Sequence, residues 1–161
     1  MSHGEILSDE LRRALRGDAW HGPALHEILE HLSAEEAMQR PIPTAHSIWE
    51  LVAHIASWSN IALRRINGGQ VEPFDGEDWP EVHDFSHEKW EEARTTLSES
   101  FERLSEVVLG MSDDQLLKNA PKSQRTIAGM VNGVAQHAAY HGGQISLLKK
   151  IVTTHHRRTA L

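Results

Sequence analysis

The sequence contains no cysteine, and this absence removes a whole group of possible sites at once. Disulfides, thiolate metal centres, iron–sulfur clusters and a cysteine nucleophile are all excluded. Any thiol chemistry at this protein therefore has to use a thiol that enters as a substrate or cofactor.

Positive charge is also scarce. The 161 residues include 16 Lys and Arg against 23 Asp and Glu, a formal net charge of −7 with His neutral. A dedicated nucleic-acid binder would need a basic face, so we expect no nucleic-acid partner. No apolar run approaches the roughly 18 residues of a membrane span. The N-terminal segment MSHGEILSDELRRAL carries acids where a signal peptide needs an apolar core, so we expect a soluble, cytoplasmic protein without membrane contact.

Strand patterns are almost absent, because no segment of useful length alternates apolar and polar residues. The helical period, in contrast, recurs in four long segments. These segments are 5–32, 47–67, 86–109 and 126–150. They predict an all-α four-helix bundle in one domain, residues 1–161, with a core over about 5–150 and a C-terminal tail over 151–161.

The first segment is expected to be a broken helix. Gly17 and Asp18 weaken the helical pattern after one apolar stripe. Gly22 and Pro23 then start a second stripe, because proline is well placed in the first turn of a new helix.

Capping boxes indicate where two further helices begin. Ser33 with Glu36, and Ser47 with Glu50, have the spacing in which a serine hydroxyl and a carboxylate satisfy free backbone N–H groups. The first box predicts a short helix and the second predicts the second long helix. Residues 68–85, rich in Gly, Pro and acids, predict a long loop between the second and third long helices, and loops of this length often cover a functional site.

Histidine is the unusual residue, with 12 in the chain. It is the commonest metal ligand and titrates near neutral pH. In the last helix His141 takes an inward position of a 3.5-residue apolar repeat, and His137, one turn earlier, points to the same region. The repeat consists of Ile127, Val131, Val134, Ala138, His141, Ile145 and Leu148. Unpaired buried imidazoles are costly, and a shared metal ion is one reason for two of them to occur together.

A third histidine, His54, stands among apolar residues in LVAHIASW, in the middle of the second long helix. With His137 and His141 it could form a three-imidazole site, which leaves positions open for water or substrate. The alternatives are a hydrogen-bonded core histidine at position 54 and a chance HxxxH pair on a helix surface. Ala138 excludes the metalloprotease motif HExxH, because the general base of that motif is missing.

Four segments give the chain a resemblance to the DinB/YfiT-like superfamily over about residues 5–150. They are GDAWHGPAL, PIPTAHSIWELVAHIASW, the Gly-rich loop that follows, and QHAAYHGGQISLLKK. The resemblance implies a four-helix bundle, frequent homodimers, and a divalent metal held by His54, His137 and His141. Members of this superfamily include S-transferases that use bacillithiol or mycothiol and a mycothiol-dependent maleylpyruvate isomerase.

We therefore expect a metal-dependent enzyme that acts on a small molecule, with Zn²⁺ or Ni²⁺ on the three imidazoles. Neutral ligands leave the full charge of the ion in the site, and this charge lowers the pKa of a bound thiol or water. By family analogy a low-molecular-weight thiol attacks an electrophilic substrate as its thiolate. A metal-dependent hydrolase and a non-enzymatic metal-binding stress-response module are the alternatives.

Other residues are weaker candidates for the site. His21, at the break in the first helix, suits a pocket mouth or a plain surface position. Glu50 could hydrogen-bond a ligand imidazole or act as a base, although its capping box already explains it. Gln144 could reach the pocket, and Trp79 could close over the site or a dimer partner. We expect Tyr140 to pack.

Gly129 and Gly133 precede His137 on the same helical line. We expect them to allow close helix approach, within the bundle or at a dimer contact, rather than to contact a substrate. Seven further histidines lie at predicted helix ends or in predicted loops, and we expect them on the surface. They are His3, His31, His46, His83, His87, His155 and His156.

Overall fold

The computed structural model describes the backbone of residues 1–159 and the side chains of residues 1–154. Within this part of the chain there is no β-strand, and the predicted all-α class is confirmed. The helices are α1 (His3–Arg16), α2 (Leu25–Leu29), α3 (Ala34–Met38), α4 (Ile48–Ile66), α5 (His87–Leu109), α6 (Asp113–Leu116) and α7 (Ile127–Thr159). No helix in the described residues is long and apolar enough to cross a membrane.

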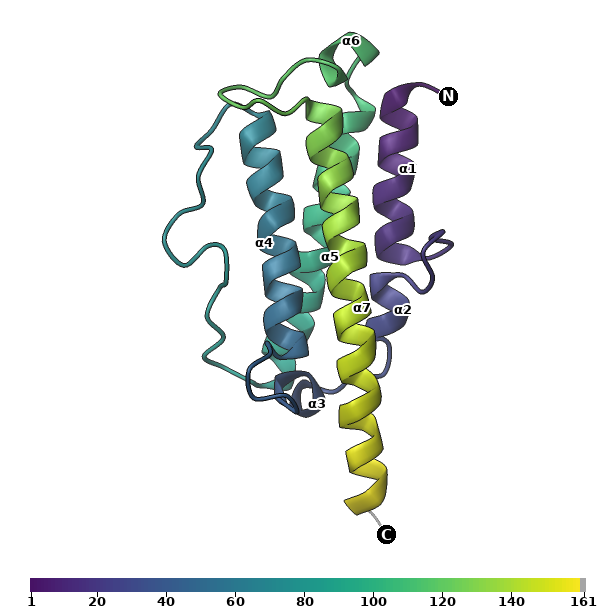
Figure 1. Ribbon diagram of the computed structural model, residues 1–161, viewed down its shortest axis with the longest axis vertical. Helices are drawn as coiled ribbons and strands as arrows, with labels where there is room; N and C mark the ends of the chain where they lie inside the picture. The colour runs from purple at the N-terminus through teal and green to yellow at the C-terminus, as the bar shows by residue number, and fades with distance from the viewer. Residues whose placement is uncertain (160–161) are drawn as a thin grey trace.

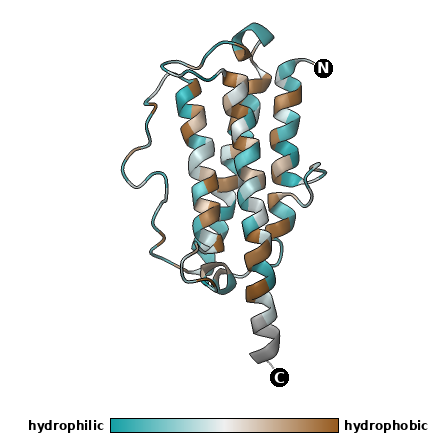
Figure 2. Ribbon diagram, viewed as in Figure 1, coloured by the Kyte–Doolittle hydropathy of each residue, from teal (hydrophilic) through white to brown (hydrophobic). Residues whose placement is uncertain are grey.

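The four long helices form the bundle, in which α1 and α4 each pack against both α5 and α7 (Figure 1). The loop between α4 and α5 returns along the outside of α4 to the end where α4 began. As a result α5 runs parallel to α4, while α1 and α7 run the other way. Figure 2 shows that this loop is mainly hydrophilic, whereas apolar residues recur along the helices.

Serine caps explain where the helices begin. Ser33 and Ser47 each accept a hydrogen bond from the backbone N–H of the glutamate three residues later, whose carboxylate binds the serine N–H in return. Both predicted capping boxes are therefore confirmed. Serine side chains also cap α1, α5 and α6.

The first helix is broken as predicted. α1 ends at Arg16, and Gly17 and Asp18 follow with φ angles of 150° and 59°. Glycine adopts positive φ readily, whereas Asp18 is one of the few residue types that tolerate it. The Asp18 carboxylate is held 2.7 Å from the guanidinium of Arg13. α2 then begins at Leu25, directly after the Gly22–Ala24 segment.

The last helix is longer than expected. It ends at Thr159 rather than near residue 150, so the expected tail over 151–161 begins as a continuation of α7. The side chains of His155 and His156 lie outside the described residues. The seven inward positions of the apolar repeat are all buried, and they are Ile127, Val131, Val134, Ala138, His141, Ile145 and Leu148.

Core packing sets the position of α4 relative to α7. Val52 and Ile55 of α4 belong to the same buried cluster as Val134 and Ala138 of α7. Burial of large apolar side chains stabilises the fold by roughly 1.5–3 kcal/mol each. These residues lie next to His54 and the α7 histidines in the sequence. The core therefore brings the imidazoles together without help from a metal.

Candidate metal centre

Three histidines from two helices converge between α4 and α7, and we call them the triad: His54, His137 and His141. One ring nitrogen from each lies within 4.8 Å of the others. The Nε2 atoms of His54 and His137 are 3.0 Å apart. His54 is 5% exposed and His141 7% exposed, while His137 is half-buried. The structure thus brings together the three residues that the sequence singles out as metal ligands.

The second ring nitrogen of two triad members is already occupied. His54 Nδ1 donates to the backbone carbonyl of Asp78 over 2.5 Å, and His141 Nδ1 donates to Oε1 of Gln144 over 2.8 Å. A carbonyl oxygen only accepts, so Nδ1 carries the proton in both rings and Nε2 carries a lone pair, which in His54 faces Nε2 of His137. Within the described residues, the buried Nδ1 of His137 has no hydrogen-bond partner. The hydrogen bonds to Asp78 and Gln144 therefore orient the imidazoles of His54 and His141.

The surroundings disfavour the charged form of His137 and His141. The pKa of His137 is lowered to about 4, mainly by burial and also by the neighbouring His141 and His54, against a smaller opposing effect of Asp78. Burial also lowers the pKa of His141, although its hydrogen bond to Gln144 acts in the opposite direction. Metal binding requires neutral imidazoles, because a proton on the ligand nitrogen competes with the ion.

The donor set fits a divalent transition metal. Imidazole nitrogens suit Zn, Ni, Cu and Fe, and Zn–N bonds of about 2.0–2.1 Å bring two nitrogens of one tetrahedral ion to roughly 3.4 Å from each other. The 3.0 Å between Nε2 of His54 and Nε2 of His137 is close to this separation. Lone pairs that face one another at this distance repel unless a proton or a cation lies between them.

Trp79 covers the triad, as expected for the long loop. Its indole lies flat on the His54 ring, with the ring centres 3.8 Å apart and the planes 6° from parallel. The other side of the indole stacks on His46 at 3.6 Å and 8°. His46 lies at the surface as expected, because 43% of its side chain is exposed, although its ring stacks on Trp79.

Polar contacts hold this part of the loop against α4. Arg64 donates two hydrogen bonds to the Glu77 carboxylate, one of them at 2.8 Å, and this pairing lowers the pKa of Glu77. Trp58 Nε1 donates to the carboxylate of Asp78 over 2.7 Å. The Asp78 carbonyl is thereby placed where it can accept the hydrogen bond from His54. Sequence reasoning missed Asp78, and its only sign was the acidic character of the loop.

A pocket of about 520 Å³ adjoins the triad. Its lining combines an apolar surface with two arginines and one carboxylate: His54, Trp58, Ala62, Arg65, Asp78, Arg125, Gly129, Met130, Gly133, Val134 and His137. A Cβ atom placed on Gly133 would have no other atom within 4 Å, and one on Gly129 would meet only the Thr126 hydroxyl, at 3.0 Å. The expected close packing within the bundle is therefore wrong at these glycines, since both line the pocket.

The remaining sequence candidates lie elsewhere. His21 is exposed and lines hollows beside α7 that do not include the triad. Glu50 caps α4 and pairs with Arg40. Burial alone would raise the pKa of Glu50, but its bonds to Ser47 and Arg40 bring the pKa below the ordinary value. Tyr140 is 66% exposed, so the expectation that it packs is wrong.

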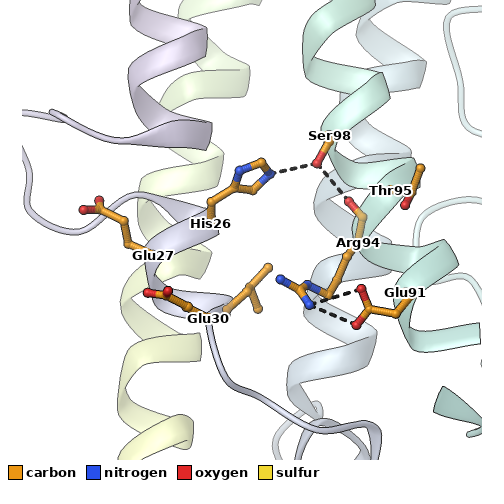
Figure 3. A pocket seen from close by; sticks show the side chains of 8 residues that line it. His26, Glu27, Glu30, Glu91, Arg94, Thr95 and Ser98 are labelled. Carbon is orange, nitrogen blue, oxygen red and sulfur yellow. Dashed lines mark hydrogen bonds and ion pairs between the residues drawn. The ribbon is translucent and has the colours of Figure 1, made fainter. Parts of the chain in front are cut away.

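A second hollow, of about 480 Å³, contains His26, which the sequence analysis did not single out. Figure 3 shows His26 of α2 pointing toward Ser98 of α5, and the atoms His26 Nε2 and Ser98 Oγ are 2.8 Å apart. The Ser98 hydroxyl donates to the Arg94 carbonyl over 3.0 Å, so His26 Nε2 acts as the donor to Ser98. Among the described residues, the triad is the group of histidines and acids close enough to hold a metal.

Comparison with protein families agrees with this geometry. The profile of the DinB superfamily matches residues 19–145. The chain belongs to the DinB superfamily. The matched region of this DinB-superfamily protein contains the triad and Gln144, which orients His141. No curated protein and no solved structure was found to match the chain.

Proposed function

We propose that this DinB-superfamily protein is a metal-dependent enzyme that transfers a low-molecular-weight thiol to an electrophilic small molecule. One observation carries the proposal: three imidazoles converge, and two of them, His54 and His137, line a pocket of about 520 Å³. Zn²⁺ or Ni²⁺ is the proposed ion. When bound, such an ion supplies the positive charge that lowers the pKa of a thiol or water.

The residues of the chain have separate tasks in this proposal. The triad holds the ion, while the Asp78 carbonyl and Gln144 keep two imidazoles in the orientation that frees Nε2. Trp79 shields the His54 face of the site from water. The apolar side chains of Met130 and Val134 offer a surface for the electrophile.

The proposed reaction forms one bond and breaks one. The sulfur of the thiolate bonds to an electrophilic carbon of the substrate, and the leaving group departs with its bonding electron pair. The proton of the thiol passes to solvent. The chain has no cysteine, so the thiol comes from solution.

The test compares metal-free, zinc-loaded and nickel-loaded protein with 1-chloro-2,4-dinitrobenzene and a panel of thiols. We expect thioether formation and chloride release that need both metal and thiol and that are lost in His141→Ala. The matched control His26→Ala keeps the activity. Hydrolysis of 4-nitrophenyl acetate without any thiol would favour a hydrolase instead. Stoichiometric metal binding without turnover in either assay would favour a non-enzymatic module.

We also propose a homodimer. Large apolar side chains project into solvent from the segment after α1 and from α7: Trp20 is 101% exposed, Tyr140 66% and Leu147 58%. Exposed aromatic residues of this kind are enriched at protein interfaces. Sedimentation velocity should give twice the monomer mass, and Trp20→Ser should shift the equilibrium toward monomer. A monomer at all concentrations would contradict the proposal.

A further inference from the structure

The pocket beside the triad carries two arginines that form no close ion pair among the described residues, although the charge of Arg65 acts on Glu77. Arg65 is half-buried, donates from Nε to the carbonyl of Val71, and holds its guanidinium 5.3 Å from the centre of the Trp58 ring. Arg125 is exposed just before α7 begins. The neighbouring Arg64, in contrast, is paired with Glu77. Both pocket arginines therefore keep guanidinium donors free for a ligand.

An open groove along α7 joins these arginines to the triad. Gly129 and Gly133 lie two turns and one turn before His137, and both line the pocket. Glycine inside a helix costs about 1 kcal/mol relative to alanine. At Gly133 no packing contact offsets this cost, because a Cβ would have no other atom within 4 Å. The absence of a side chain at Gly133 leaves space for a ligand.

We propose that this pocket binds an elongated thiol that carries a carboxylate, with the acidic group at Arg65 and Arg125 and the sulfur at the triad. The inference rests on the proposed function, because it names the class of thiol that the enzyme takes. A planar guanidinium matches a carboxylate with two parallel hydrogen bonds, which an uncharged group cannot replace. The apolar surface between the two ends accommodates the alkyl part of such a molecule.

The geometry limits the length of the ligand. The Trp58 ring centre lies 6.4 Å from that of His54 and 5.3 Å from the Arg65 guanidinium carbon, so this carbon is at most about 12 Å from the centre of the His54 ring. An extended chain of roughly eight carbons spans a distance on the order of 10 Å. The probes are therefore 8-mercaptooctanoate and the uncharged 8-mercaptooctanol, which have the same length and the same thiol.

The experiment measures both dissociation constants by calorimetry on the zinc-loaded protein. Charge-assisted hydrogen bonds to an arginine make the acid about tenfold tighter than the alcohol. Arg125→Gln and Arg65→Gln each reduce this preference, and together they remove it. Arg12→Gln, a change at an exposed arginine of α1 that is also without an ion pair among the described residues, leaves the preference unchanged.

A second pair of variants tests the groove. Gly133→Leu fills the pocket and weakens both probes about tenfold or more, because a side chain of this size occupies the path between the arginines and the triad. Gly143→Leu is the matched control: it lies on the same helix, also has no atom within 4 Å of its Cβ, and is outside this pocket. Circular dichroism verifies that each variant is folded. Unchanged binding in Gly133→Leu would overturn the proposal.

The outcomes separate this inference from the proposed function. Equal affinity for acid and alcohol, or a preference that survives in the Arg65/Arg125 double variant, overturns the carboxylate site and leaves the thiol-transfer proposal in place. If neither probe binds, and neither changes the visible spectrum of protein loaded with Co²⁺ in place of zinc, the proposed thiol chemistry itself fails.

Discussion

Two hollows on this bundle have nearly the same volume, about 520 Å³ beside the triad and about 480 Å³ beside His26. Each contains an imidazole whose pKa is lowered, and burial is the largest cause in both. Hollow size and a shifted pKa therefore do not distinguish a functional site from a structural one here.

The two hollows differ in where the ring nitrogens point. His26 donates a hydrogen bond from Nε2 to Ser98 and so links α2 to α5. In the triad the outer nitrogens of His54 and His141 are bound to protein oxygens, and the inner ones face a common point. Convergence of three ring nitrogens is the feature that marks the candidate metal centre.

The largest expected effect contrasts one histidine from each hollow. His141→Ala should lower metal affinity by more than about a hundredfold, since even the loss of a hydrogen-bond partner to a ligand costs roughly 10- to 100-fold. His26→Ala should leave metal affinity unchanged. Calorimetric titration with Zn²⁺ measures both, and far-UV circular dichroism should show intact helices in each. Equal loss in the two variants would remove the distinction between the hollows.

The next prediction changes the hydrogen-bond partner of the imidazole rather than the imidazole. Gln144→Ala should reduce metal affinity by about tenfold, because His141 is no longer held with Nε2 free. Ser98→Ala should cost about 1 kcal/mol in the free energy of unfolding, through the lost bond to His26, with no effect on metal. Urea unfolding and zinc titration of both variants give the comparison. A change in metal affinity in Ser98→Ala would contradict it.

The third prediction concerns pH in the metal-free protein. His137 has a pKa of about 4 in the folded state against the ordinary histidine value of 6.5, so the unfolded chain takes up the proton first as the pH falls. Its contribution to stability is complete above pH 6.5 and declines toward pH 4. After allowance for partial exposure, the loss is about 1–2 kcal/mol. Urea unfolding of wild type and His137→Gln at pH 7.5 and 4.5 should show a smaller decline in the variant.

The smallest expected effect is a gain in stability. Gly133→Ala should raise the free energy of unfolding by about 0.5–1 kcal/mol, because alanine is the better helix former and its Cβ meets no other atom. Gly143→Ala should give the same gain. Only Gly133→Ala should weaken ligand binding in the pocket. Thermal unfolding measures the stability of both, and a destabilised Gly133→Ala would mean that the helix needs a glycine at this position.

The helices and the triad were predictable because their signals are local. Ser33 and Ser47 cap helices through contacts with residues three positions away. His137 and His141 share a face because they are one turn apart, and the apolar repeat around them fixes which face is buried. His54 was recognisable as a polar residue among apolar neighbours.

The cover of the site was harder to predict. Asp78 approaches the triad through the course of a loop that has no repeating pattern, and it lies 24 residues after His54, its hydrogen-bond partner. Gly133 looked like a close-packing residue because glycine has the same sequence signature whether a helix or empty space faces it. Only the position of neighbouring atoms separates these cases.

The triad and its surroundings are supplied by one side of the bundle. Within the described residues, its imidazoles and the groups that orient or cover them come from α4, α7 and the segments on either side of α4. Substitutions on that side alter the surroundings of the triad, whereas substitutions on α1 and α5 act mainly through packing. Divergence among proteins with this site should therefore accumulate on α1 and α5. New substrate preferences could evolve through α4, α7 and their flanking segments while the other half of the bundle maintains the fold.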